Sequence, residues 1–156
     1  MSPGLLVVDI SVIVTLSVII GASAPRWPDR WLRSDVGPLR PVPGETARMY
    51  RRIGISTLIR RLPELGTLFG GESKSALPGM SVADLRRYLR EVRRAEWVHW
   101  GSITATLVLF AFNPWPLALL FWLLVVAGNL PFITILRHNR LRILGILERK
   151  DAARDD

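Results

Sequence analysis

The residue types with the clearest chemical potential gather in the ten residues from Glu91 to Trp100. This segment holds two carboxylates, two arginines, a histidine and two tryptophans, where a basic stretch meets an apolar one. On a helix, Glu96 and His99 are three residues apart and share a face, so the carboxylate can orient the imidazole and fix its tautomer. An oriented imidazole is a suitable general base for a hydroxyl group. The alternative is that both residues only cap and solvate a helix entry.

A second charged cluster, Arg137-His138-Asn139-Arg140, follows the last apolar segment. Charged groups at the mouth of a membrane helix are costly to desolvate and usually have a function. Arg94 and Arg140 each lie close to an apolar boundary and a histidine, which favours them for a substrate contact. The other arginines are typical of a surface that neutralises anionic headgroups, or that holds the phosphates of an acyl carrier such as coenzyme A.

The residue inventory disfavours metal and thiol chemistry. The Glu96–His99 spacing matches the Glu-x-x-His element of di-iron bundles, but those bundles use two such pairs and further carboxylates. His138 has no acidic residue nearby in the sequence, so we expect no metal site. The chain has no cysteine, which excludes disulfides, thiolate ligands and cysteine nucleophiles.

The composition indicates a small membrane protein with basic faces. The 156 residues suffice for a single domain, 1–156, and 49% of them are hydrophobic, yet the formal charge is +8. A soluble nucleic-acid-binding protein of this charge would not need long apolar runs, so we expect no nucleic-acid partner.

Three apolar runs predict an all-α integral membrane domain with about three spans. Residues 4–24 and 116–136 are long enough to cross a bilayer, whereas 98–113 is short, so its helix is expected to begin in the charged motif. Asn113 to Pro116 contains two prolines, which separate the last two spans into a hairpin. Residues 4–24 also resemble a cleaved signal peptide, but a basic n-region is missing, which favours a retained helix.

The segment 25–97 is expected to be basic and to lie in the cytoplasm or at the membrane interface. Its first part carries five prolines and predicts a loop. Apolar residues then recur at helical spacing from Glu45 to Leu62 among arginines, which is typical of an amphipathic helix in the headgroup plane. Ser81 is the expected N-cap of a helix that runs from Val82 into the second span.

The distribution of Lys and Arg predicts the orientation. Segment 25–97 carries 15 of the 21 basic residues, and the basic tail 137–156 carries the other 6. Three spans place both regions on one side, which the positive-inside rule assigns to the cytoplasm. We therefore expect a multi-pass protein of the bacterial inner membrane, with its N-terminus outside and its C-terminus in the cytoplasm.

An asparagine lies inside the third apolar run, two residues before Pro131. Asn129 would need a polar partner in the membrane, so it is expected to face the other helices rather than lipid. It serves either helix packing or contact with a substrate.

Several motifs occur in the order in which one known family carries them. Together they resemble the glycosyl-4,4'-diaponeurosporenoate acyltransferase family, which comprises small membrane proteins of staphyloxanthin-type carotenoid synthesis. The resemblance extends from about Arg52 to Arg142. The motifs are Arg52-Ile53-Gly54-Ile55, Leu62-Pro63-Glu64-Leu65-Gly66, Phe69-Gly70-Gly71 with Lys74, Glu91 to Trp100, Asn129 to Phe132, and Arg137 to Arg140.

The resemblance implies transfer of a fatty acyl group to a sugar hydroxyl of a membrane glycolipid or carotenoid glycoside. It implies acyl-CoA or acyl carrier protein as the donor, and no bound cofactor. In the hypothesis that follows, His99 held by Glu96 takes the hydroxyl proton, and Arg94 or Arg140, with Asn139, stabilises the oxyanion. Lys74 and the arginine-rich helix hold the phosphates of the donor. The expected substrate contacts are Glu91, Trp100, Asn129, Arg137, Lys74 and Arg52.

Two functions of other classes stay open. A non-enzymatic subunit or lipid-binding scaffold of a larger membrane complex fits the small size, because three helices barely enclose a pocket. A nucleic-acid-binding membrane anchor explains the charge but not the carboxylates and histidine at the helix mouth. A membrane protein partner or a homo-oligomer is compatible with the enzyme and with the scaffold.

Overall fold

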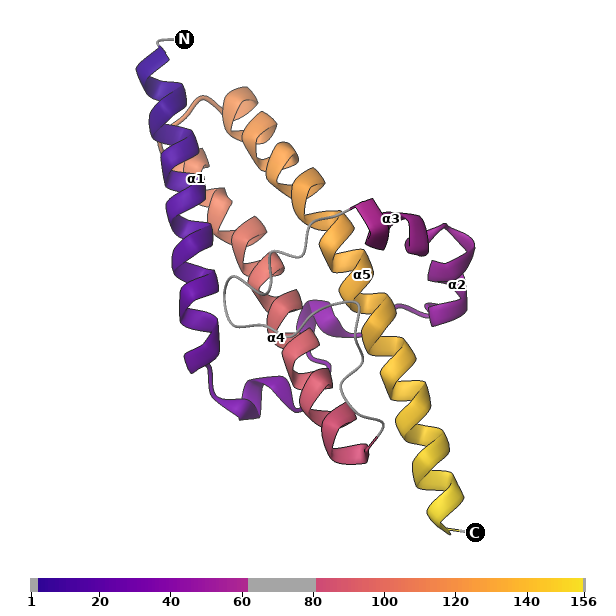
Figure 1. Cartoon of the computed structure of the whole chain (residues 1–156). Helices are drawn as coiled ribbons and strands as arrows, with labels where there is room; N and C mark the ends of the chain where they lie inside the picture. Colours follow the sequence, from indigo (N-terminus) through magenta and orange to yellow (C-terminus); the bar gives the residue numbers. More distant parts are fainter. Residues whose placement is uncertain (1–2, 62–80, 156) are drawn as a thin grey trace.

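The computed structural model of the chain describes residues 3–61 and 81–155, and every regular element among them is helical (Figure 1). The predicted all-α class is confirmed for this part of the chain. The α-helices are α1 (Pro3–Ser23), α2 (Ala47–Arg52), α3 (Ile55–Arg61), α4 (Val82–Ala105) and α5 (Trp115–Asp155). Short 3₁₀ turns connect them: η1 (Ala24–Arg26), η2 (Asp29–Leu32), η3 (Gly37–Leu39) and η5 (Thr106–Ala111).

The three long helices α1, α4 and α5 form the body of the molecule (Figure 1). The main packing joins α4 to α5 through a buried apolar cluster that includes Leu85, Leu89, Leu136 and Ile143. On the other side of α4, Gly101 lets α1 approach closely, since a Cβ at Gly101 would lie 3.3 Å from the Ile20 side chain.

The short helices α2 and α3 pack against the middle of α5, where Figure 1 shows them beside it. Tyr50, Ile55 and Ile135 form the buried apolar contact. We expected one helix from Glu45 to Leu62. The structure instead has two helices within its described part, because Gly54 adopts a φ of 81° and ends the first.

Two helices, over Gly4–Arg26 and Trp115–Ala153, are long and apolar enough to cross a membrane, which is consistent with a membrane protein. The expected count of three spans is not confirmed. The predicted span 98–113 is divided between the end of α4 and η5, and α4 carries eight charged residues. The third predicted span, 116–136, is part of a longer helix. This helix, α5, runs through Pro131 and ends at Asp155.

Capping side chains set where two helices begin. The Ser81 hydroxyl accepts a hydrogen bond from the backbone N–H of Asp84 at 3.1 Å, which confirms the predicted N-cap of α4. Thr46 caps α2 in the same way, accepting from Met49 N–H at 3.2 Å. The start of α4 matters for the site, because this helix carries the predicted site residues from Glu91 to Trp100.

A polar contact joins the N-terminal part of α1 to the turn between η5 and α5. Asp9 is buried within the first apolar helix, and its Oδ1 accepts a hydrogen bond of 2.9 Å from Asn113 Nδ2. Leu6, Val12 and Ile13 pack nearby on the buried cluster around Phe121. Helix α1 is therefore an integrated part of this fold.

Candidate active site

His99 projects from α4 toward α5, where an asparagine and an aromatic ring hold it. Its Nδ1 lies 2.7 Å from Asn129 Oδ1, and its ring stacks on Phe132 with centroids 5.1 Å apart and planes 9° apart. Asn129 Nδ2 donates to the Val125 carbonyl at 2.8 Å. The helix thus fixes the amide, and the amide and Phe132 together fix the imidazole.

The orientation of Asn129 determines the tautomer of His99. A backbone carbonyl only accepts hydrogen bonds, so the amide nitrogen must face Val125 and the amide oxygen must face the imidazole. The proton in the His99–Asn129 contact therefore belongs to Nδ1. In the neutral ring, Nε2 then carries the lone pair that a general base needs.

Glu96 lies one helical turn before His99 and faces two arginines of α5. Arg140 Nε donates to Glu96 Oε2 at 3.1 Å, and Arg137 Nη1 donates to Oε1 at 3.3 Å. Glu96 and Arg140 are both fully buried. The structure thus gives Glu96 the arginines as partners and gives His99 the amide of Asn129. Glu96 and His99 share a face of α4, as we expected, but they do not pair with each other. Each contacts different residues of α5.

The contacts of Glu96 belong to a larger set of buried charges, which we term the ion network. Two further carboxylates come from the segment before α2: Asp35 binds Arg93 at 2.7 Å and also binds Arg140, while Glu45 binds Arg137 at 2.5 Å. Each charge meets an opposite charge, which offsets the cost of removing it from water. The members are Arg93, Arg137, Arg140, Asp35, Glu45 and Glu96.

The same arginines fasten the segment 32–45 to the helices. Arg93 Nη1 donates to the carbonyls of Leu32 at 3.1 Å and Arg33 at 3.0 Å. Arg137 donates to the carbonyls of Pro38 at 2.7 Å and Arg40 at 3.0 Å. The segment contains few regular backbone hydrogen bonds, so these side chains determine its path across α4 and α5.

Among the described residues outside the helices, Glu45 has a carboxyl whose pKa is strongly lowered. Burial alone would raise its pKa, but hydrogen bonds from Arg137, from Tyr50 at 2.5 Å and from the Val42 N–H at 2.8 Å lower it to about 2. Burial and the hydrogen bond to Glu45 raise the pKa of the Tyr50 phenol to about 12. Glu45 is therefore ionised and Tyr50 neutral at physiological pH.

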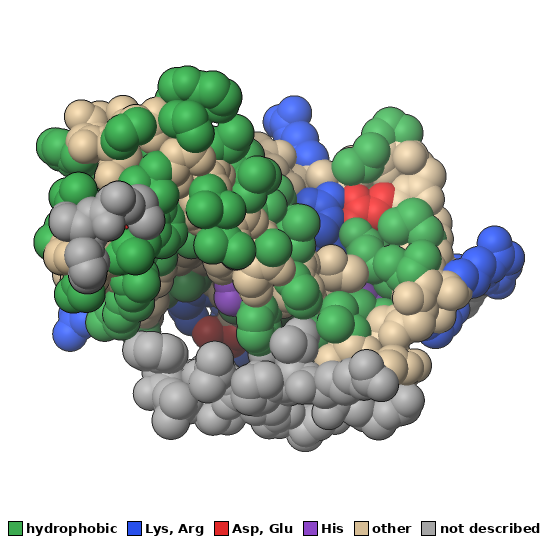
Figure 2. All heavy atoms as spheres, turned by 90° about the horizontal axis from the view of Figure 1, so that it is seen from above, with side chains coloured by type: hydrophobic (Ala, Val, Ile, Leu, Met, Phe, Trp, Pro, Cys, Tyr) green, Lys and Arg blue, Asp and Glu red, His purple; other side chains and the backbone are tan. Residues whose placement is uncertain are grey.

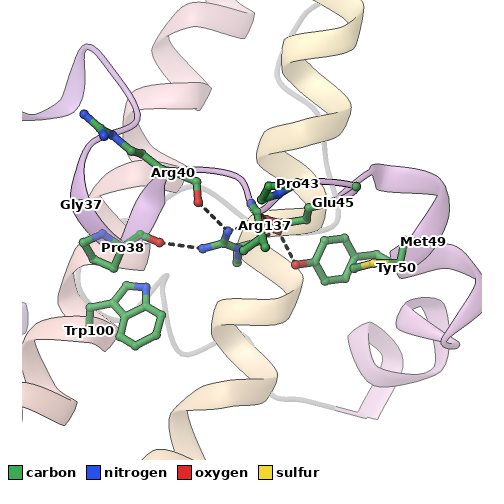
Figure 3. A pocket seen from close by; sticks show the side chains of 11 residues that line it. Gly37, Pro38, Arg40, Pro43, Glu45, Met49, Tyr50, Trp100 and Arg137 are labelled. Atoms are coloured by element: carbon green, nitrogen blue, oxygen red, sulfur yellow. Dashed lines mark hydrogen bonds and ion pairs between the residues drawn. The ribbon is translucent and has the colours of Figure 1, made fainter.

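A cavity of about 630 Å³ lies beside the ion network, between the segment 37–45, α2, α4 and α5 (Figure 3). Trp100 and Arg137, two predicted substrate contacts, line it. His99 is the neighbour of Trp100 in sequence but faces Asn129, about 100° around α4. The other lining residues are Gly37, Pro38, Arg40, Val42, Pro43, Gly44, Glu45, Met49 and Tyr50.

Figure 2 views the molecule from the end where α1 begins. Apolar side chains cover most of this face. A histidine is visible in a gap between them, with acidic and basic side chains deeper in the molecule.

The structure brings some predicted site residues together and separates others. Glu96, Arg137 and Arg140 meet in the ion network, and His99 meets Asn129. Arg94 instead pairs with Glu91 on its own helix. Trp100 lines the cavity, Asn139 is half-buried on α5 and Arg52 is exposed at the end of α2. Lys74 lies outside the described residues.

Three members of the ion network were missing from the sequence-based prediction. Asp35 lies in a proline-rich stretch without periodicity, Glu45 stands at the first position of the predicted amphipathic helix, and Arg93 is one of many arginines. The only available signal for Arg93 was its spacing, because it lies three residues before Glu96 and so shares a face of α4 with it.

Two helices that are long and apolar enough to cross a membrane, beside a buried polar interior, are consistent with a helical membrane protein. The family model for glycosyl-4,4'-diaponeurosporenoate acyltransferase matches residues 28–149, which include every predicted site residue. The chain belongs to this family of acyltransferases, whose name indicates carotenoid glycoside modification, and the resemblance seen in the motifs is confirmed. No curated protein and no solved structure matches the chain.

Proposed function

We propose that this protein transfers a fatty acyl group from acyl-CoA or acyl carrier protein to a sugar hydroxyl of a membrane glycoside, with His99 as the general base. The observation that carries the proposal is the contact of His99 Nδ1 with Asn129 Oδ1, because it assigns the lone pair to Nε2. Asn129 thus takes the orienting role that the sequence alone suggested for Glu96.

The proposed reaction is a direct acyl transfer. His99 Nε2 takes the proton of the acceptor hydroxyl. At the same time, the hydroxyl oxygen attacks the acyl carbonyl carbon and forms the new C–O bond. The tetrahedral intermediate expels the thiolate of the donor, and the proton on Nε2 passes to the leaving sulfur. Asn129 Oδ1 accepts a hydrogen bond from Nδ1–H throughout and stabilises the imidazolium.

The arginines divide into two roles in this proposal. Arg140 uses its donors on Glu96 and Asp35, so we assign it to positioning. Arg94 has a buried Nε without a hydrogen-bond partner among the described residues, and it remains the proposed oxyanion donor. Asn139 is ten residues, or about 15 Å, along α5 from Asn129, which is too far from His99 for this role. Arg52 and Lys74 remain proposed contacts of the donor's phosphates.

The proposed orientation places the basic end of the molecule in the cytoplasm. Arg86 near the start of α4 lies 3.7 Å from Asp151 near the end of α5, so these basic regions share one end. The N-terminus of α1 lies at the other end in Figure 1. This arrangement supports an external N-terminus and a cytoplasmic C-terminus.

A transfer assay with purified protein tests the proposal. Wild-type protein in detergent is given acyl-CoA or acyl carrier protein donors and a carotenoid glycoside, and the acylated product is measured by mass spectrometry. The proposal predicts that His99→Ala lowers turnover by about 10²–10⁴-fold while the protein still purifies as a folded species. Full turnover by His99→Ala would refute the general-base role, and absence of transfer by wild type would favour the scaffold function.

A further inference from the structure

The cavity beside the ion network has no role in the proposed proton transfer. Its volume of about 630 Å³ lies in the range of small-molecule sites, and three parts of the chain far apart in sequence build it: residues 37–50, Trp100 and Arg137. Figure 3 shows Trp100 and Pro38 on one side of Arg137, and Met49 and Tyr50 on the other. The chemistry of these walls determines which ligand the cavity can bind.

Three polar side chains of the wall, Arg137, Glu45 and Tyr50, are engaged with one another. Arg137 donates to Glu45, to Glu96 and to the carbonyls of Pro38 and Arg40. Both oxygens of Glu45 accept hydrogen bonds, and the Tyr50 hydroxyl donates to one of them. A sugar would need many available donors and acceptors. Apart from the Trp100 indole Nε1, which is buried without a hydrogen-bond partner among the described residues, and Arg40 at the rim, the polar side chains of the wall already use theirs.

The rest of the wall is apolar and in part open. Pro38, Pro43 and the Trp100 indole line the cavity together with Val42 and Met49. Val42 is 63% exposed and Met49 is 39% exposed, although both are apolar. Clustered exposed apolar groups at a cavity mark a binding surface, and mutually satisfied polar groups beside them favour a hydrocarbon ligand.

The positively charged guanidinium group of Arg40 lies at the rim of the cavity. The exposed Arg40 side chain extends away from the Arg137 cluster, while its backbone carbonyl accepts from Arg137 (Figure 3). The position of this guanidinium suits an anionic group outside the cavity, such as a phosphate. The combination of apolar wall and cationic rim matches an acyl chain that carries an anionic head.

We infer that this cavity binds the fatty acyl chain of the acyl donor, with Arg40 at the donor's anionic group. The inference rests on the proposed function for the source of the chain. The site is distinct from the His99–Asn129 pair, because Trp100 and His99 leave α4 in directions about 100° apart. Binding can therefore be measured separately from transfer.

The test uses a photoreactive acyl-CoA with a diazirine in its chain, applied to the full-length protein in detergent. Adducts are mapped by peptide mass spectrometry, with unlabelled acyl-CoA or phosphatidylglycerol as competitor. Met49→Trp fills the cavity, and Val42→Trp does so from its exposed rim. Ile53→Trp is the matched control, because Ile53 follows α2, is 65% exposed and does not line the cavity.

We expect adducts on residues 37–50 and on Trp100, displaced by acyl-CoA and reduced about tenfold or more by each filling variant. Ile53→Trp should label like wild type, and His99→Ala should label normally although it fails in transfer. Unchanged labelling in both filling variants would overturn the inference. So would adducts confined to α1 and α5, or displacement by phosphatidylglycerol alone, which would make the ligand a bulk lipid. Normal labelling without any transfer by wild type would contradict the proposed function alone.

Discussion

At the scale of single residues, His99 and Asn129 carry the proposed chemistry. The helical spacing predicted a face of α4 that bears Glu96 and His99, and the structure has that face. It could not predict their partners, because these come from α5, about 30 to 44 residues away along the chain. Asn129 was singled out from its place in an apolar run, since a buried amide needs a partner.

Replacing Asn129 tests how the imidazole is oriented. Asn129→Ala removes the acceptor that holds Nδ1–H, so the ring loses its fixed tautomer and orientation. We expect turnover to fall roughly tenfold to a hundredfold, less than the loss on removing the base itself, with little change in KM. Steady-state kinetics measure both constants. A rise in KM at constant turnover would instead indicate a substrate-binding role for Asn129.

Glu96 is expected to act on stability rather than on proton transfer. Glu96→Gln leaves the ion network with three arginines and only two carboxylates, Asp35 and Glu45, and one uncompensated buried charge costs about 3–5 kcal/mol. Thermal unfolding in detergent should show a clearly lower midpoint. The double variant Glu96→Leu with Arg140→Met should recover part of the loss, because it removes both charges. If Glu96→Gln unfolds at the wild-type temperature but loses turnover, Glu96 acts on His99 rather than on stability.

At the scale of elements, the ion network joins the irregular segment 32–45 to α4 and α5. The helices were largely predictable: the Ser81 cap and the helix from Val82 followed from local signals. The path of the segment was not predictable, because salt bridges to Asp35 and Glu45 determine it and no periodicity marks them. The break at Gly54 was missed because the apolar spacing continues through it.

The attachment of this segment should depend on pH through Glu45. Its pKa of about 2 in the folded protein lies below the ordinary value of 4.5, so its carboxylate stabilises the fold fully above about pH 4.5. This contribution is lost as the pH falls from about 4.5 toward 2. Hydrogen exchange of residues 37–45 should therefore accelerate across this range. Glu45→Gln should exchange fast already at pH 7 and show a much smaller change, and an equally steep change in that variant would contradict the assignment.

At the scale of the whole molecule, the open question is whether α4 and η5 cross the bilayer with α1 and α5. The apolar runs predicted three spans, whereas only two helices of the described chain have the required length and hydropathy. Composition could not settle this, because the charges of α4 are buried in part against α5 rather than exposed to lipid. The contact of Asp9 with Asn113 places the hairpin turn beside the N-terminal part of α1.

Single cysteines can map the topology, because the chain has none of its own. Phe112→Cys lies in the hairpin turn at a position 78% exposed, and Ala152→Cys lies at the exposed end of α5. In intact cells, a membrane-impermeant maleimide should label Phe112→Cys but should label Ala152→Cys only after permeabilisation. Labelling of both positions from the same side would refute the crossing of α5 and the proposed orientation.

The most direct test of the central claim is lipid mass spectrometry of the native host after deletion of the gene. The strain is complemented with wild type or with His99→Ala at matched membrane levels. We predict that deletion removes one acyl chain from a glycoside, that wild type restores it, and that His99→Ala does not. Unchanged lipids after deletion, or full restoration by His99→Ala, would contradict acyl transfer with His99 as its base.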